Sequence, residues 1–152
     1  MEHWELAARE SIRDLVARYN TNGDAGRFDP MLELFTEDAS MELPDGVHRG
    51  LPAIRAIFEG ASSSTGDAPG TRAKFIRHFT ATHQIDLASQ SEARGSCYFV
   101  VYTDRGADHW GRYIDDYRCV DGRWLFAGRK VTVDGSVPGG WADTRLRGES
   151  AE

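Results

Sequence analysis

The sequence is poor in cysteine and in basic residues, and it has no long apolar run. Among 152 residues, 18 Lys and Arg face 24 Asp and Glu, which gives a net charge of −6. Nucleic-acid binding depends on basic surfaces, so this balance argues against a nucleic-acid partner. A run of about 18 apolar residues, as a membrane span needs, does not occur. The amphipathic N-terminus, "MEHWELAARESIRDL", lacks the apolar core of a signal peptide, so we expect a cytoplasmic protein.

The spacing of the few cysteines and histidines also does not match the spacing of metal ligands. Cys97 and Cys119 both lie in predicted strands and are expected to be buried free thiols. No cysteine or histidine spacing suggests a zinc site. The Ser-rich stretch 60–71 lacks the lysine and the strand–helix context of a phosphate loop. We therefore expect neither a metal nor another cofactor.

What the sequence does contain is a helical first half and a strand-rich second half. A helix is predicted over about 5–20, where Ile12, Leu15, Val16 and Tyr19 recur on one face. A second helix begins at Asp29 and ends near residue 38, and a third follows from about residue 50. A short strand is expected at 39–43, and four longer ones at 72–87, 92–103, 109–120 and 122–133.

This order predicts an α+β fold with three helices packed on a curved antiparallel sheet. A sheet that curls around helices leaves a cavity, where a small ligand can bind. We assign residues 1–134 to one domain. Residues 60–71 are expected to form a mobile surface loop, and residues 135–152 a flexible C-terminal tail.

The stretch "HWGRYIDDYRCVDGRWLFAGRK" predicts a hairpin with an unexpected residue on its apolar face. Asp121-Gly122 fits a two-residue turn. Counting outward from it pairs Tyr117 with Phe126, and Asp115 with a glycine. Arg129 falls on the opposite face. The predicted inner face carries a carboxylate among aromatic residues: Trp110, Tyr113, Asp115, Tyr117, Cys119, Trp124 and Phe126. A buried carboxylate needs a partner, so Asp115 binds either a ligand or a structural donor such as a tyrosine.

Three segments carry a family resemblance over about residues 5–134. They are "YNTNGDAGRFDPMLELFTEDA", "RHF" at 77–79 and "GRYIDDYRCVDGRWLFAGRKVTVD". The sequence resembles the nuclear transport factor 2-like superfamily and, within it, the SnoaL-like group that includes scytalone dehydratase. The resemblance implies a cone-shaped α+β fold. It leaves the reaction open, because this superfamily hosts dehydratases, isomerases, cyclases, epoxide hydrolases and binding domains.

The resemblance transfers only some of the functional residues. His78 matches the acid/base histidine of the dehydratases. Their aspartate falls near Asn20 or Thr21, neither of which is a carboxylate, so Asp24 is the candidate replacement, and the alternative is that Asp24 is a turn aspartate that binds backbone amides. Their second histidine falls near Tyr102 or Thr103 and is absent.

His78 and His83 lie five residues apart in one predicted strand, so a regular strand turns them to opposite faces. The resemblance favours His78 in the pocket. The alternation of apolar residues favours His83. A β-bulge near "TAT", residues 80–82, would bring both inward.

The leading hypothesis is a cofactor-independent lyase or isomerase acting on a small apolar molecule, aromatic or polyketide-like. His78 and Asp24 are the candidate catalytic residues. The candidate substrate-binding residues are Tyr19, His83, Trp110, Tyr113 and Asp115. The alternative is a binding or accessory domain without catalysis. We also expect a homodimer through the outer face of the sheet, where Val100, Tyr102, Ile114, Leu125 and Val131 would be exposed.

Overall fold

A computed structural model of the chain describes residues 1–63 and 73–146. Loop residues 64–71 of the predicted mobile segment, and tail residues 147–152, lie outside that range. The elements are α1 (His3–Asp24), α2 (Phe28–Leu32), β1 (Phe35–Leu43), β2 (Gly46–Arg49), α3 (Leu51–Ser63), β3 (Ile76–Leu87), β4 (Glu92–Thr103), β5 (Gly106–Val120), β6 (Arg123–Ser136) and α4 (Trp141–Leu146).

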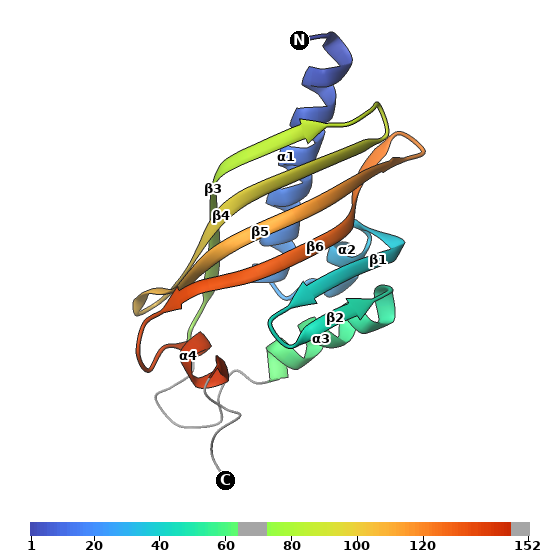
Figure 1. The fold of residues 1–152 in the computed structure, drawn as a ribbon. Coiled ribbons are helices and arrows are strands. Elements are labelled where there is room, and N and C mark those ends of the chain that lie inside the picture. The colour runs from blue at the N-terminus through green and yellow to red at the C-terminus, as the bar shows by residue number, and fades with distance from the viewer. Residues whose placement is uncertain (64–72, 147–152) are drawn as a thin grey trace.

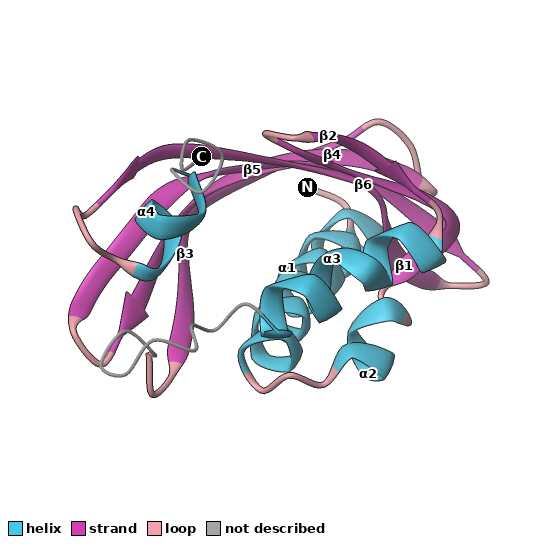
Figure 2. Cartoon of the chain, turned by 90° about the horizontal axis from the view of Figure 1, so that it is seen from below, coloured by secondary structure: helices cyan, strands magenta, loops and turns pink. Residues whose placement is uncertain are grey.

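One curved sheet holds all six strands, in the order β2-β1-β6-β5-β4-β3. The sheet arches over α1, α2 and α3, which fill its concave side (Figures 1 and 2). This arrangement confirms the predicted α+β fold. One pairing differs from the expected antiparallel sheet, because β1 runs parallel to β6.

The main core lies between α1 and the inner face of the sheet. Ile12, Leu15 and Val16 are buried on the predicted face of α1. Two boundaries differ from the prediction. Helix α1 continues to Asp24, four residues past its expected end. Helix α2 ends at Leu32, because Phe35 already pairs with Phe126 in the parallel β1–β6 ladder.

The β5–β6 hairpin has the predicted turn and then changes register. Asp121 and Gly122 both have positive φ, and Tyr117 pairs with Phe126 as expected. Beyond that pair, Ala127 is an extra residue in β6, so Asp115 pairs with Arg129 rather than with a glycine. A one-residue bulge moves every later side chain of a strand to the other face. The prediction that Arg129 and Val131 face outward was therefore wrong.

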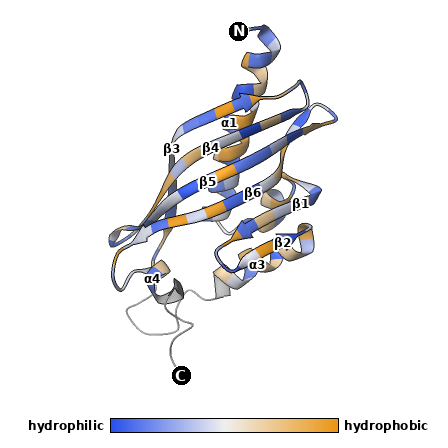
Figure 3. Cartoon of the chain, viewed as in Figure 1, coloured by the Kyte–Doolittle hydropathy of each residue, from blue (hydrophilic) through white to orange (hydrophobic). Residues whose placement is uncertain are grey.

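The outer face of the sheet carries several exposed apolar side chains. Phe79, Tyr98, Tyr102, Trp110 and Ile114 are each at least 40% exposed. Figure 3 shows apolar and polar residues interspersed along β3 to β6. The placement of Trp110 on the inner face was wrong. It lies three residues before Tyr113, so simple alternation already turns the two to opposite faces, and its ring packs over Gly135.

Residues 135–146, assigned from the sequence to a flexible tail, form the end of β6 and helix α4. The Asp108 carboxylate explains the placement, since it accepts hydrogen bonds from the backbone N–H groups of Trp141 at 2.6 Å and Ala142 at 3.1 Å. These contacts join segments more than 30 residues apart, which no local sequence pattern reveals. Among the described residues, none of the helices combines the length and the apolar character needed to cross a bilayer.

Candidate functional site

A cavity of about 680 Å³ opens between the concave face of the sheet and helices α1 to α4. Its size suits one small organic molecule. Most of its walls are apolar, with aromatic residues Phe28, Phe58, Phe75, Phe99 and Trp141 among them. The polar groups that line it include Asn20, Asp24, His78, His109 and Tyr113.

His78 and Asp24 meet in this cavity. The Nδ1 atom of His78 lies 2.6 Å from Oδ1 of Asp24, and the backbone N–H of His78 donates to Oδ2 at 3.0 Å. The two side chains are 26% and 11% exposed. A carboxylate on Nδ1 fixes the ring orientation and leaves Nε2 as the atom that can exchange a proton. The last residue of α1 and the start of β3 thus build a histidine–carboxylate pair.

A bulge in β3 determines which of the two histidines, His78 and His83, face the inside of the sheet. Thr82 and His83 stand opposite the single residue Cys97, and Thr82 has a φ of 54°. Because the bulge reverses the alternation, both histidines face inward. His83 is half-buried outside the cavity lining, and its Nε2 lies 3.2 Å from the Tyr117 hydroxyl. Burial lowers the pKa of His83.

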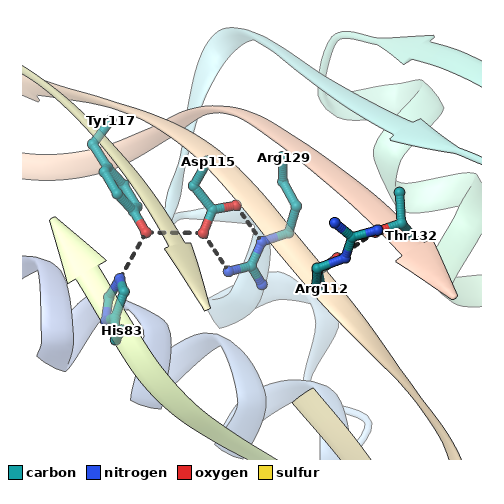
Figure 4. A network of polar contacts seen from close by, with 6 residues as sticks. All are labelled: His83, Arg112, Asp115, Tyr117, Arg129 and Thr132. Atoms are coloured by element: carbon teal, nitrogen blue, oxygen red, sulfur yellow. Dashed lines mark hydrogen bonds and ion pairs between the residues drawn. The ribbon is translucent and has the colours of Figure 1, made fainter. Parts of the chain in front are cut away.

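Asp115 belongs to a buried network beneath the cavity (Figure 4). Its carboxylate accepts two hydrogen bonds from Arg129, at 2.8 and 2.9 Å, and one from the Tyr117 hydroxyl at 2.8 Å. The side chains of Asp115 and Arg129 are both 0% exposed. The Arg129 guanidinium lies 4.2 Å from the ring centre of Tyr19 and 3.9 Å from that of Tyr113. Asp115 therefore has a full set of protein partners and does not line the cavity.

Tyr19 and Tyr113 do line the cavity, as the sequence suggested. Burial raises the pKa of both phenols, so both stay protonated near neutral pH and can donate hydrogen bonds. Asn20 lies beside them. It is 8% exposed, and its Oδ1 atom is buried without a hydrogen-bond partner in the described part of the chain. Such an acceptor is costly to bury unless a ligand satisfies it.

Sequence reasoning missed a second histidine–carboxylate pair. Nδ1 of His109 lies 2.8 Å from Oδ2 of the neighbouring Asp108, and both residues are buried. The His109 ring lies 5.7 Å from that of Trp141 and 5.9 Å from that of Phe99. The adjacent "DH" within "DRGADHW" was the available signal, but Asp108 lies just before the strand predicted at 109–120.

Comparison with known proteins identifies the family. No curated protein matches the chain. A candidate scytalone dehydratase from Novosphingobium aromaticivorans has a similar structure, with a TM-score of 0.77, 21% identity, and coverage of 90% of this chain and 91% of that one. The LinA-type3 hexachlorocyclohexane dehydrochlorinase from Novosphingobium barchaimii gives a TM-score of 0.73 and 16% identity, with 89% and 92% coverage.

A third similar structure is Rv3472 from Mycobacterium tuberculosis, a protein of unknown function. Its TM-score is 0.73 and its identity 26%, with 87% of this chain and 79% of that one covered. The family model for the SnoaL-like domain matches residues 4–130. The chain therefore belongs to the SnoaL-like family, within the nuclear transport factor 2-like superfamily.

Proposed function

We propose that this protein is a cofactor-independent lyase or isomerase in which His78, oriented by Asp24, moves a proton on a small substrate. The observation that carries the proposal is the 2.6 Å contact between Nδ1 of His78 and Asp24, inside a cavity of about 680 Å³. A histidine is suited to this role because its unperturbed pKa, about 6.5, lies near neutrality. Asp24 stabilises the imidazolium that forms when Nε2 takes up a proton.

The cavity lining defines the substrate class. Aromatic and aliphatic walls favour a molecule with an apolar or aromatic ring. The phenol of Tyr113 can donate a hydrogen bond to a carbonyl oxygen, and Oδ1 of Asn20 can accept one from a hydroxyl. We infer a ring compound that carries both oxygen functions. Two of the structural neighbours are named for eliminations, a dehydratase and a dehydrochlorinase, which agrees with proton abstraction next to a leaving group.

A direct test uses 2-tetralone, which has an aromatic ring and an exchangeable proton beside its carbonyl. In heavy water, the wild-type protein should accelerate deuterium incorporation, as followed by NMR. Asp24→Asn keeps the size of the side chain but removes the charge that stabilises the imidazolium. We expect it to slow exchange about 10- to 100-fold, since each tenfold step corresponds to about 1.4 kcal/mol.

The opposite result favours the alternative function. If 2-tetralone or a related aromatic ketone quenches the tryptophan fluorescence, to which Trp141 of the cavity wall contributes, but no exchange exceeds the uncatalysed rate, the protein is better described as a binding domain. If exchange occurs at the same rate in wild type and Asp24→Asn, the histidine–carboxylate pair is not the base. Circular dichroism of both proteins provides the control for folding.

We also propose that two chains associate through the outer face of the sheet. Five exposed apolar side chains lie there: Phe79, Tyr98, Tyr102, Trp110 and Ile114. Five large apolar side chains on one face of a sheet are more often covered by a partner than exposed to water. Light scattering should give a molecular mass of twice the 16.9 kDa of one chain. The Ile114→Glu variant should have the mass of a single chain. A wild-type mass of one chain at working concentration would contradict the proposal.

A further inference from the structure

We infer that the substrate carries a hydrocarbon chain next to its reacting carbon, and that an apolar compartment on the α2–α3 side of the cavity holds this chain. The inference rests on the proposed function and deepens it by naming the part of the substrate that does not react. Four half-buried apolar side chains form the apolar compartment: Phe28 of α2, Leu43 of β1, and Ile57 and Phe58 of α3.

The apolar compartment lies across the cavity from the strand that carries His78. In the sheet order, β6, β5 and β4 separate β1 from β3. Neighbouring strands lie about 4.8 Å apart, so β1 and β3 are about 19 Å apart along the sheet. The sheet curves, and the two strands lie toward opposite ends of its arch (Figure 2). Because Leu43 and His78 both line one cavity, that cavity extends from the reacting pair to the compartment.

A continuous row of rings lines the cavity from the reacting histidine to the apolar compartment. Its members all belong to the cavity lining and are, in order, His78, Phe99, Tyr113, Tyr19, Phe58 and Phe28. The centroids of successive rings are 6.5, 4.6, 6.4, 6.1 and 6.0 Å apart. The apolar wall also begins close to Asp24: a Cβ placed on the preceding residue, Gly23, would lie 3.3 Å from Sδ of Met31, which lines the cavity. A chain attached next to the reacting carbon can therefore follow this wall into the compartment.

The walls of the apolar compartment suit a flexible chain better than a second flat ring system. Every described residue that lines the cavity from α2, β1 or α3 is apolar. Phe28 and Phe58 stack on each other, with 22° between their planes, so one face of each ring is already covered. The rest of the wall is aliphatic or thioether, and the thioether of Met41 can adapt its shape to a ligand. Asp45 in the β1–β2 turn also lines the cavity, but its side chain is 61% exposed and contacts His48 at 3.1 Å, which places its charge at the rim.

The volume of the cavity exceeds what one small ring compound fills. An apolar cavity of about 150 Å³ holds one benzene ring, so a two-ring ketone such as 2-tetralone takes roughly 300 Å³. The whole cavity measures about 680 Å³, so 2-tetralone would leave more than half of it unfilled. Binding sites for small molecules enclose most of the surface of their ligand. A chain of several carbons fills the space that the reacting ring leaves, and each methylene that enters the compartment strengthens binding.

A series of phenyl ketones that differ only in chain length tests this inference. Propiophenone, butyrophenone, valerophenone and hexanophenone share the aromatic ring and the exchangeable protons beside the carbonyl, and each is one methylene longer than the last. Titration calorimetry with the full chain should show binding that becomes about fourfold tighter with each methylene, because each one leaves water for an apolar wall. From the first ketone to the last, the dissociation constant should fall about 50-fold.

Two tryptophan variants of α3 show where the chain lies. Ile57→Trp fills the apolar compartment, and Ala56→Trp is its matched control, because Ala56 is the neighbouring residue and is exposed. In Ile57→Trp the dissociation constants of the first and last ketones should differ by less than about threefold, whereas Ala56→Trp should keep the wild-type series. Ile57→Ala enlarges the compartment, so binding should go on tightening for chains about two carbons longer than in wild type. An unfolded variant could not show that gain.

Equal affinity of the wild-type protein for all four ketones, or binding of none of them, would overturn the inference. The wild-type series in Ile57→Trp would also overturn it, since the chain would then lie elsewhere. Deuterium exchange into the same ketones separates this result from the proposed function. Chain-dependent binding without exchange would contradict the proposed function and leave the compartment as the ligand site of a binding domain. Exchange without dependence on chain length would overturn the compartment alone.

Discussion

Replacing His78 by glutamine is expected to lower turnover about 10²- to 10⁴-fold while ligand binding is retained. General acid–base catalysis contributes on this scale, and glutamine keeps the approximate size and hydrogen-bonding capacity of histidine without exchanging protons near neutral pH. The glutamine side chain can still donate to Asp24, so the cavity keeps its shape. Deuterium exchange into 2-tetralone measures the rate, and quenching of the tryptophan fluorescence measures binding.

His83→Gln is the matched control, because both histidines lie in β3 and both face inward. His83 contacts the Tyr117 hydroxyl and is not part of the cavity lining, so its replacement should leave turnover within about twofold of wild type. If His83→Gln abolishes turnover and His78→Gln preserves it, the base has been assigned to the wrong histidine. If neither replacement changes turnover, histidine acid–base chemistry is not the mechanism.

The second large effect is expected on stability. Arg129→Met or Asp115→Leu alone should lower the free energy of unfolding by about 3–5 kcal/mol, because each leaves the other charge buried and unpaired. Both side chains are 0% exposed, so water cannot replace the missing partner. Burial disfavours the charged guanidinium, yet the paired carboxylate outweighs it and raises the pKa of Arg129. Urea unfolding followed by circular dichroism gives the free energies.

The double variant, Asp115→Leu with Arg129→Met, shows whether the two side chains stabilise the protein as an ion pair or contribute independently to the free energy of unfolding. It removes both charges together, so its loss should be well below the sum of the two single losses. An additive loss would contradict the pairing. A further variant, Asp115→Asn, tests the substrate-binding role first assigned to Asp115. If Asp115→Asn abolished turnover but left stability unchanged, that role would be restored.

Local sequence patterns were sufficient for most of the elements and for part of the site. The strand at 92–103 and the hairpin around Asp121-Gly122 follow from β-rich runs and from turn residues that tolerate positive φ. His78 and Asp24 were both named as catalytic candidates, and the structure places them in contact. Their roles remain predictions until activity is measured.

What the sequence determined by itself was the fold class and the order of the elements other than β2 and α4, because helix and strand periods and turn chemistry act over a few residues. The tertiary structure decided which side chains face the cavity. One extra residue at Thr82 and another at Ala127 reverse the alternation, turning His83 and Arg129 inward. The tertiary structure also decided that Asp108 contacts both His109 and α4. The contacts with α4 join residues far apart in the chain and form only when the sheet has curved.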